Sequence, residues 1–249
     1  IGPPSTNTPM RVAALYDIHG NLPALEAVLA DVRAEDVDHI VIGGDVLPGP
    51  MPDACLSVLD ALDVPVSYIA GNGEGDVVAL GRGGDLSRVP AAFHPVIEWC
   101  RNELSGAHLS AVTLELDIAG LGRVLFCHAT PRDDNELFTE ITPVERIRSV
   151  FDEPGVPLIV CGHTHMQFDR PVGDTRVINA GSVGMPFGEP GAYWALLGPG
   201  VELRRTEYDL TYAAERLANT EYPRVAPFDV HNPPGAEEMR TVFEAAAMR

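Results

Sequence analysis

The chain has 249 residues, of which 45% are hydrophobic and 21% are charged, a composition typical of a folded globular protein and not of a disordered one. Its 36 acidic residues outnumber its 17 basic ones, all of them arginine, so the formal net charge is −19 at pH 7. Such an acidic surface repels phosphate backbones, and we expect no double-stranded nucleic acid as a partner. An anionic substrate would need local positive charge, which a bound metal ion can supply.

The lengths of the apolar runs and the spacing of the cysteines restrict the cellular location that we predict. Runs such as Leu158–Cys161 are too short to span a bilayer, so no membrane partner is expected. No charged and then apolar leader opens the chain, and we expect no secretory signal. The cysteines stand singly, without a C-x-x-C pair, at Cys55, Cys100, Cys127 and Cys161. This usage excludes a disulfide framework and suits a reducing compartment, so we predict a cytoplasmic protein.

The first third of the chain predicts alternating strands and helices. Short apolar runs at residues 12–16, 39–42 and 66–69 are typical of buried parallel strands. Apolar residues recur at helical spacing over 22–32, and a second helix is predicted at 52–62. This alternation indicates parallel βαβ units with right-handed crossovers.

The rest of the chain predicts hairpins and helices. We predict a buried strand at 157–161, helices near 90–104, 210–218 and 236–248, and hairpins over 113–127, 167–179 and 193–207. With the first third, this pattern predicts one domain with two sheets and flanking helices.

Domain boundaries follow from proline content and periodicity. Residues 1–9 contain three prolines and no periodic pattern, and are predicted to be a tag remnant or a disordered extension. The remaining residues, 10–249, are predicted to form a single domain. Its core covers about 10–207, and a helical segment over 210–249 follows.

Polar residues follow the predicted strands at the point where each strand ends. Ligands of open α/β sheets bind outside the carboxyl ends of the strands, so these side chains are expected to meet at one rim. Taken alone, each motif has an ordinary explanation, such as a turn or a helix cap. Together they form a set of seven candidate metal ligands: Asp17, His19, Asp45, Asn72, His128, His163 and His165.

The chemistry of this set indicates metal ions. Mixed imidazole and carboxylate ligands suit Mn, Fe, Zn or Ni, whereas all-oxygen sets suit Ca or Mg. Seven ligands are too many for one tetrahedral ion and suit two ions that share a carboxylate. Two such ions can hold the attacking and leaving oxygens of a displacement at phosphorus.

The order of these motifs along the chain resembles that of one known family. The motifs are Asp17-x-His19, Gly44-Asp45, Gly71-Asn72, His128 and Gly162-His163-x-His165. They are similar to those of the calcineurin-like metallophosphoesterase superfamily, in particular its small bacterial and archaeal phosphodiesterases. The likeness runs from Met10 to about Glu207. It implies an α/β fold, the metallo-dependent phosphatase fold: a four-layer α/β/β/α sandwich with two mixed β-sheets.

The resemblance also implies roles for the ligands. It assigns Asp17, His19 and His165 to one metal, Asn72, His128 and His163 to the other, and Asp45 to both. The implied cofactors are two divalent transition-metal ions, with Mn favoured and Fe, Zn or Ni as alternatives. A hydroxide that bridges the ions would attack phosphorus, which makes Asp45, Asn72 and His128 catalytic as well as ligating.

One position departs from the family. A histidine that acts on the leaving group commonly follows the asparagine, but this chain has Gly73 and then Glu74. Glu74 could replace that acid if burial kept it protonated, but at a strand end next to glycines it is expected to be ionised. Without that acid, alkyl phosphomonoesters should react slowly. We therefore predict a phosphodiesterase for small phosphodiesters, such as cyclic or other nucleotides.

Several softer candidates lie near the ligands. Arg132 is predicted to contact a substrate phosphate through its guanidinium group. Ser182 either lines the site or makes the turn in which it lies. Strand alternation should turn Cys127 and Cys161 away from the site, as small buried hydrophobes.

Two other functions remain open from the sequence. The first is a metal-binding scaffold of the same fold that binds proteins with little or no catalysis, a reading that the glycine at position 73 favours. The segment over 210–249 could then be a partner surface or a surface for homo-oligomers. The second is a metal-dependent hydrolase of non-phosphate esters, which lacks support because no acyl nucleophile is recognised.

Overall fold

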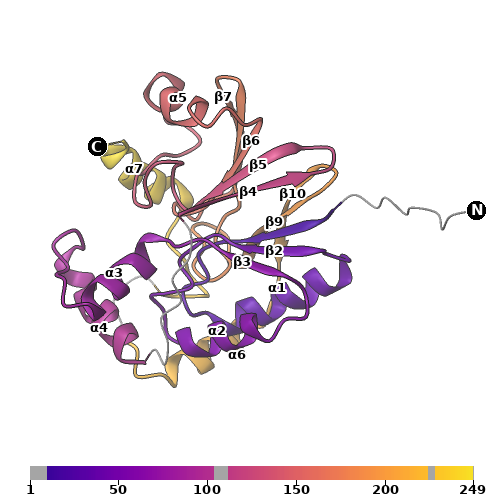
Figure 1. Cartoon of the computed structure of the whole chain (residues 1–249). Coiled ribbons are helices and arrows are strands. Elements are labelled where there is room, and N and C mark those ends of the chain that lie inside the picture. Colours follow the sequence, from indigo (N-terminus) through magenta and orange to yellow (C-terminus); the bar gives the residue numbers. More distant parts are fainter. Residues whose placement is uncertain (1–9, 104–111, 224–227, 249) are drawn as a thin grey trace, which may run out of the picture.

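The computed structural model describes residues 10–103, 112–223 and 228–248, so the extension predicted at 1–9 and the last residue of the helix predicted over 90–104 lie outside it. Two five-stranded sheets pack face to face (Figure 1). Each sheet contains both parallel and antiparallel neighbours. The prediction of two mixed sheets is confirmed.

The first sheet has the strand order β10-β9-β1-β2-β3. Its parallel strands are β1 (Val12–Leu15), β2 (His39–Ile42) and β3 (Val66–Tyr68), joined by α1 (Leu22–Ala34) and α2 (Pro52–Asp60). Antiparallel β9 (Ala192–Leu197) pairs with β1, and β10 (Val201–Thr206) forms the edge. Helix α1 begins where expected, because the Asn21 side chain accepts the Ala24 N–H and a proline occupies the first turn.

The second sheet has the strand order β4-β5-β6-β8-β7. Two predicted hairpins form its sides, β4 (Thr113–Ile118) with β5 (Gly122–Cys127) and β7 (Phe168–Val172) with β8 (Thr175–Asn179). The predicted buried strand is β6 (Leu158–Cys161), which is parallel to both β5 and β8 at the centre.

Helices cover both outer faces and complete four layers (Figure 1). On the first sheet lie α1, α2, α3 (Asn72–Gly81), the one-turn η1 (Ala91–Phe93), α4 (His94–Glu103) and α6 (Leu210–Ala218). On the second lie α5 (Val144–Asp152) and α7 (Ala236–Ala246). The sequence analysis missed α3, whose first turn is rich in glycine, and α5, which is a short amphipathic helix.

Strand alternation divides the apolar residues among three cores. Ala13 and Leu15 of β1 face the helices, whereas Val12 and Ala14 face the second sheet. In the second sheet, Cys127 and Cys161 point outward into the core under α5, away from the ligands. The prediction that these cysteines are small buried hydrophobes is therefore confirmed.

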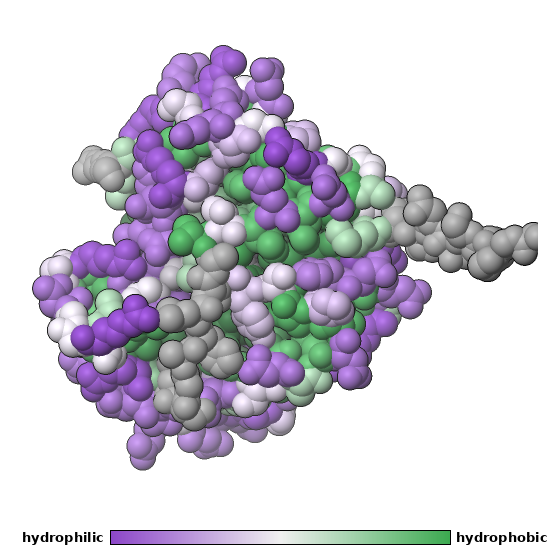
Figure 2. Space-filling view, in the orientation of Figure 1, coloured by the Kyte–Doolittle hydropathy of each residue, from purple (hydrophilic) through white to green (hydrophobic). Residues whose placement is uncertain are grey.

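The outer surface is mainly hydrophilic over the helices (Figure 2). Among the helices in the described part of the chain, none has the length and apolar character needed to cross a bilayer.

Candidate metal centre

All seven predicted ligands lie at or just beyond the carboxyl ends of strands in the two sheets. Asp17 and His19 follow β1, Asp45 follows β2, and Asn72 begins α3 after β3. From the second sheet, His128 follows β5, and His163 and His165 follow β6. The two sheets therefore present their ligands to one another along a shared rim.

The loops that carry the ligands have unusual backbone conformations. Among the described residues, seven non-glycine residues have a positive φ, and five of them are ligands: Asp17, His19, Asp45, His163 and His165. Each such residue costs on the order of 1–3 kcal/mol and persists only where its surroundings hold it in place. Concentration of this strain in the ligand loops indicates a functional site.

Glycines next to the ligands allow these loops to approach closely. Gly44 has φ of +97°, and a Cβ atom there would lie 2.6 Å from both the Gly71 nitrogen and His128 Nδ1. A Cβ atom at Gly162 would lie 2.5 Å from an Asp17 carboxylate oxygen. The glycines of the motifs are therefore required by packing around the ligands.

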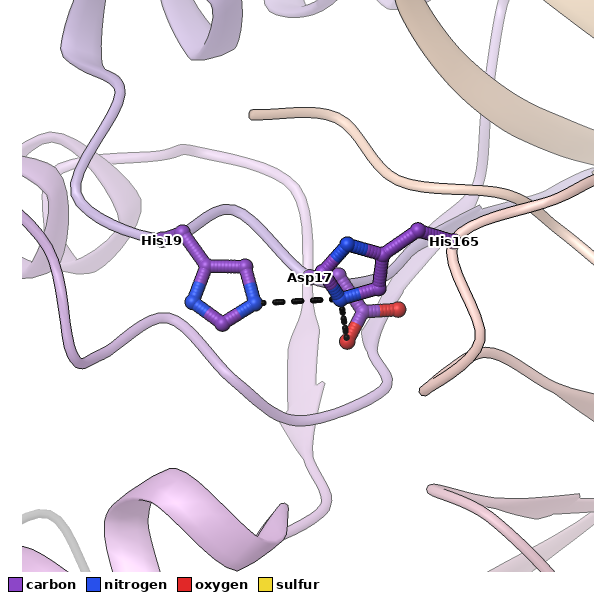
Figure 3. A group of neighbouring side chains, drawn as sticks. All are labelled: Asp17, His19 and His165. Carbon is purple, nitrogen blue, oxygen red and sulfur yellow. Dashed lines mark hydrogen bonds and ion pairs between the residues drawn. The ribbon is translucent and has the colours of Figure 1, made fainter. Parts of the chain in front are cut away.

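Asp17, His19 and His165 form one compact group (Figure 3). His19 Nε2 lies 3.2 Å from His165 Nε2, and His165 Nε2 lies 3.3 Å from Asp17 Oδ1. All three side chains are buried. The group brings together the set that the resemblance assigns to one ion.

Backbone carbonyls fix the tautomers of three histidines. A carbonyl oxygen only accepts, so the ring nitrogen next to it carries the proton and the other ring nitrogen keeps its lone pair. The pairs are His19 Nδ1 with Pro48 O at 2.9 Å, His128 Nδ1 with Gly43 O at 2.9 Å and His165 Nδ1 with Met185 O at 2.6 Å. All three Nε2 lone pairs are therefore available to bind a metal ion.

The remaining ligands form a neighbouring group. His128 Nε2 lies 3.2 Å from Asn72 Oδ1, and the rings of His128 and His163 are 5.0 Å apart. Asp45 lies between the groups, with Oδ2 3.8 Å from His19 Nε2 and Oδ1 3.6 Å from His128 Nε2.

The donor set fits metal cations, because acceptors face acceptors. Two imidazole lone pairs, those of His19 and His165, meet at 3.2 Å with both ring protons turned away to carbonyls. Asp17 Oδ1 and His163 Nε2 are buried and have no hydrogen-bond partner among the described residues. Buried acceptors in such contact repel one another unless a cation lies among them. The residues present therefore fit divalent metal ions.

Electrostatics keep these side chains in their ligating forms. Burial lowers the pKa of His19 and of His163 to about 3, with further lowering by His165 and His128 respectively, so both imidazoles are neutral near pH 7. Burial raises the pKa of Asp17, but positive charge on the neighbouring histidine rings, His165 first, would outweigh this and lower it, and a bound cation would act in the same direction. Burial, together with Glu74 and Asp17, raises the pKa of Asp45. A cation would remove this penalty on the Asp45 carboxylate.

Residues 10–198 match the family model described as the calcineurin-like phosphoesterase superfamily domain. The chain belongs to this superfamily. Its hydrolase character and its use of divalent metal follow from that membership and from the ligand cluster. An uncharacterized protein of Methanocaldococcus jannaschii, MJ0912, is 26% identical over 237 residues, which cover 85% of this chain and 93% of that protein.

Two crystal structures share the fold of this phosphoesterase over nearly its whole length. A metallophosphoesterase from Sphaerobacter thermophilus is 25% identical, with a TM-score of 0.65, and the match covers 95% of this chain and 98% of that one. The hypothetical protein PH1004 from Pyrococcus horikoshii is 18% identical, with a TM-score of 0.73, and the match covers 94% and 97%. The predicted family and fold are confirmed.

Gly73, where the family commonly has histidine, has no space for a side chain in this phosphoesterase. A Cβ atom there would collide with the Leu47 carbonyl and would lie 2.6 Å from Pro48 Cδ. Its N–H group donates to Asp45 Oδ1 at 2.8 Å. Gly73 thus orients the central carboxylate, and a Gly73→His replacement would displace the loop instead of restoring an acid.

The structure corrects the expected position of Glu74. Glu74 lies in the first turn of α3, not at a strand end, and is buried, which raises its pKa. Its carboxylate accepts the N–H groups of Asp45, Leu47 and Gly71 at 2.8, 3.1 and 2.8 Å. Glu74 therefore ties the loop after β2 to the start of α3 and holds Asp45 in place.

The softer candidates Arg132 and Ser182 are not among the residues that line the cavity beside the ligands. The exposed guanidinium of Arg132 is bound by Glu136, and Arg132 is absent from the lining of the cavity beside the ligands. Ser182 is buried, donates to the Asp17 carbonyl at 2.7 Å and accepts the Met185 N–H at 2.8 Å. Of the two alternatives for Ser182, the structure supports the turn.

A cavity of about 360 Å³ opens beside the ligands. His19, Asp45 and Asn72 line one end of it, and the rest is mainly apolar. Sequence reasoning missed several lining residues because no motif marks them and they are far apart in the chain: Arg88, Phe93, Tyr222, Phe228 and Phe243.

Proposed function

We propose that this phosphoesterase is a binuclear metal-dependent phosphodiesterase that hydrolyses small phosphodiesters, such as cyclic or other nucleotides. The observation that carries the proposal is the position of Asp45, whose two carboxylate oxygens face ligands of different groups, His19 and His128. A carboxylate shared between two groups suits two cations a few ångströms apart.

Each ion would be held by three further side chains. Asp17, His19 and His165 would hold one, and Asn72, His128 and His163 the other. Manganese suits this mixture of imidazole, carboxylate and amide, with Fe, Zn or Ni as alternatives. When bound, two such cations lower the pKa of water and neutralise charge on phosphoryl oxygens.

The chain's own residues keep the ligands in one geometry. Carbonyls of the ligand loops hold the three imidazoles by their Nδ1 protons, and Gly73 N–H holds one oxygen of Asp45. Because these partners are backbone groups, the ligands cannot rotate without moving the loops. Such preorganisation favours a reaction in which charge develops at a fixed place.

Charge along the cavity favours diesters over monoesters. Arg88 is the one arginine or lysine among the described lining residues, and it is already bound to Asp76 at 2.5 Å and to Asp134 at 3.3 Å. The cavity would therefore add little electrostatic stabilisation of a monoester dianion to that supplied by the metal centre. A diester carries one negative charge and needs less compensation.

The lack of a proton donor at position 73 favours good leaving groups. A positioned acid contributes about 10²–10⁴ in rate when an alkoxide must leave. Without one, aryl esters and strained cyclic esters should react best, because their leaving oxygens depart more readily as anions.

The test is steady-state kinetics of the manganese-loaded protein on p-nitrophenyl diesters and monoesters and on esters graded by the pKa of the leaving group, with metal content measured by mass spectrometry. We expect two ions per chain, a higher kcat/KM for diesters, and a steep fall as the leaving-group pKa rises. A flat dependence would mean that another residue donates the proton. One ion per chain would contradict the binuclear proposal.

The scaffold alternative predicts a different result in the same experiment, namely metal binding without turnover of any ester. The segment that it would use as a partner surface also contacts the domain: Arg216 of α6 pairs with Glu26 at 3.5 Å, and Glu244 of α7 accepts the Thr139 hydroxyl at 2.7 Å.

A further inference from the structure

Three of the four aromatic rings in the cavity lining come from residues that the family model does not cover. Tyr222, Phe228 and Phe243 lie after residue 198, where the match ends, and the fourth ring, Phe93, belongs to η1 within the match. In Figure 2 an indentation on the left separates the part that carries α7 from the part that carries α3 and α4. The C-terminal segment thus adds an aromatic wall, formed by Tyr222, Phe228 and Phe243, beside the metal ligands.

Aromatic contacts connect this wall to the metal ligands. The Phe187 ring stacks on His165 with centroids 5.0 Å apart and an angle of 16°, and Phe187 in turn lies 5.8 Å from Phe243. On the other side, the ring centroid of Tyr222 lies 5.2 Å from that of Trp99 and 6.3 Å from that of Phe228. Neighbouring rings therefore hold the wall in place, and Phe187 connects it to the metal ligand His165.

One ring of the pocket has more exposed surface than a core residue would have. Phe93 is 40% exposed, one of few large hydrophobic side chains in the described chain with so much open surface. When a ligand covers an exposed apolar side chain in a cavity, the removal of that surface from water favours binding.

The rim of the same pocket is polar. Arg88 and Asn135 both line the cavity, and both residues are exposed. Aromatic ring faces suit a flat heterocycle or aryl ring over an aliphatic chain, because aromatic pairs are stabilised beyond the apolar area that they bury.

We propose that this pocket binds a flat aromatic substituent of the phosphodiester, a nucleobase or an aryl ring, and that Phe93 and Phe243 determine this specificity. The inference rests on the proposed function, because it places the organic part of a substrate whose phosphate lies at the metal centre. A cavity of about 360 Å³ is in the range of small-molecule sites.

Two matched pairs of inhibitors test the proposal, with methyl p-nitrophenyl phosphate as the reporter substrate of the manganese-loaded protein. AMP and ribose 5-phosphate differ by the base, and phenylphosphonate and methylphosphonate differ by the ring. Stacking of a base contributes about 1–3 kcal/mol, so the aromatic member of a pair should bind roughly 5- to 150-fold more tightly. Calorimetric titration of the same compounds measures these ratios without turnover.

Variants place the effect in the pocket. The AMP ratio is the affinity for AMP divided by the affinity for ribose 5-phosphate. Phe93→Ala and Phe243→Ala should bring this ratio close to one while the affinity for ribose 5-phosphate is unchanged. Phe243→Leu keeps an apolar side chain against Phe187 and should lose part of the ratio, which separates stacking from loss of folding. Tyr212→Ala, on the exposed face of α6, is the matched control and should leave the ratio intact. Thermal unfolding checks each variant.

The outcomes separate the two proposals. No hydrolysis of the reporter would contradict the proposed function and, with it, this inference. Hydrolysis with equal affinities within both pairs would overturn the aromatic pocket and leave the function standing. A ratio that survives Phe93→Ala and Phe243→Ala in folded protein would also overturn it. A ratio for AMP alone assigns a nucleobase, and a ratio for both pairs assigns aryl rings in general.

Discussion

The metal centre and the aromatic pocket adjoin one another but are built in different ways. The ligands lie in short loops at strand ends, five of the seven are buried, and they are held by backbone carbonyls and N–H groups. The pocket is lined by side chains of η1, α4, α7 and the segment before α7, and its rings are only partly buried. The two regions thus differ in origin: backbone groups of the strand-end loops hold the metal ligands, whereas the pocket that we propose for the substrate's ring is formed by side chains of helices and of the segment before α7.

Asp45→Ala should give the largest effect and should not distinguish between substrates. Because Asp45 faces both ligand groups, its loss should lower metal content at both sites and reduce kcat/KM roughly 10³-fold or more for every ester. Metal analysis and kinetics measure both effects, and Asp117→Ala, at an exposed position of β4, is the control. A variant with two ions and normal rates would contradict the bridging role.

Glu74→Gln should act on the metal centre without touching the pocket. An amide cannot accept all three N–H groups without turning its own NH₂ toward a donor, so Asp45 should be held less firmly. We expect a 10- to 100-fold loss of metal affinity and destabilisation of about 1–3 kcal/mol. Chelator titration and denaturant unfolding measure both, against exposed Glu115→Gln. An unchanged AMP ratio at saturating manganese would support the separation of the two regions.

The two ions should differ in affinity. Asn72 offers a neutral amide oxygen where the other group has the carboxylate of Asp17, so its ion should be lost first, at roughly tenfold lower chelator concentration. Metal analysis during titration should show an intermediate with one ion per chain. Asn72→Asp should bring the two steps together. Loss of both ions in one step from the unmodified protein would count against this asymmetry.

Arg132→Ala should give the smallest effect. Its guanidinium is exposed and bound by Glu136, so kcat/KM should change less than about twofold for diesters and monoesters alike. A fall of tenfold or more would show that Arg132 reaches the substrate and would extend the cavity toward the loop after β5.

Much of the centre could be predicted from the sequence because its determinants are local. Apolar runs specify strands, and a polar residue directly after a strand must lie at the rim of the sheet. Positions such as Asp17 and His163 follow from this rule alone, and so does the outward direction of Cys127, one residue before His128 on an alternating strand. Helix α3 escaped prediction because Gly73 and Gly75 weaken its pattern, although packing stabilises it.

Only the tertiary structure decided the rest, because it depends on contacts between residues far apart in the chain. The tautomer of His19 is set by the carbonyl of Pro48, and Glu74 is held by N–H groups of the loops after β2 and β3. Likewise, Phe93 and Phe243, 150 residues apart in the chain, come to line the same cavity only in the folded protein. Local sequence patterns specify what each strand delivers to its end, but burial and the partners of each polar group are properties of the whole packed chain.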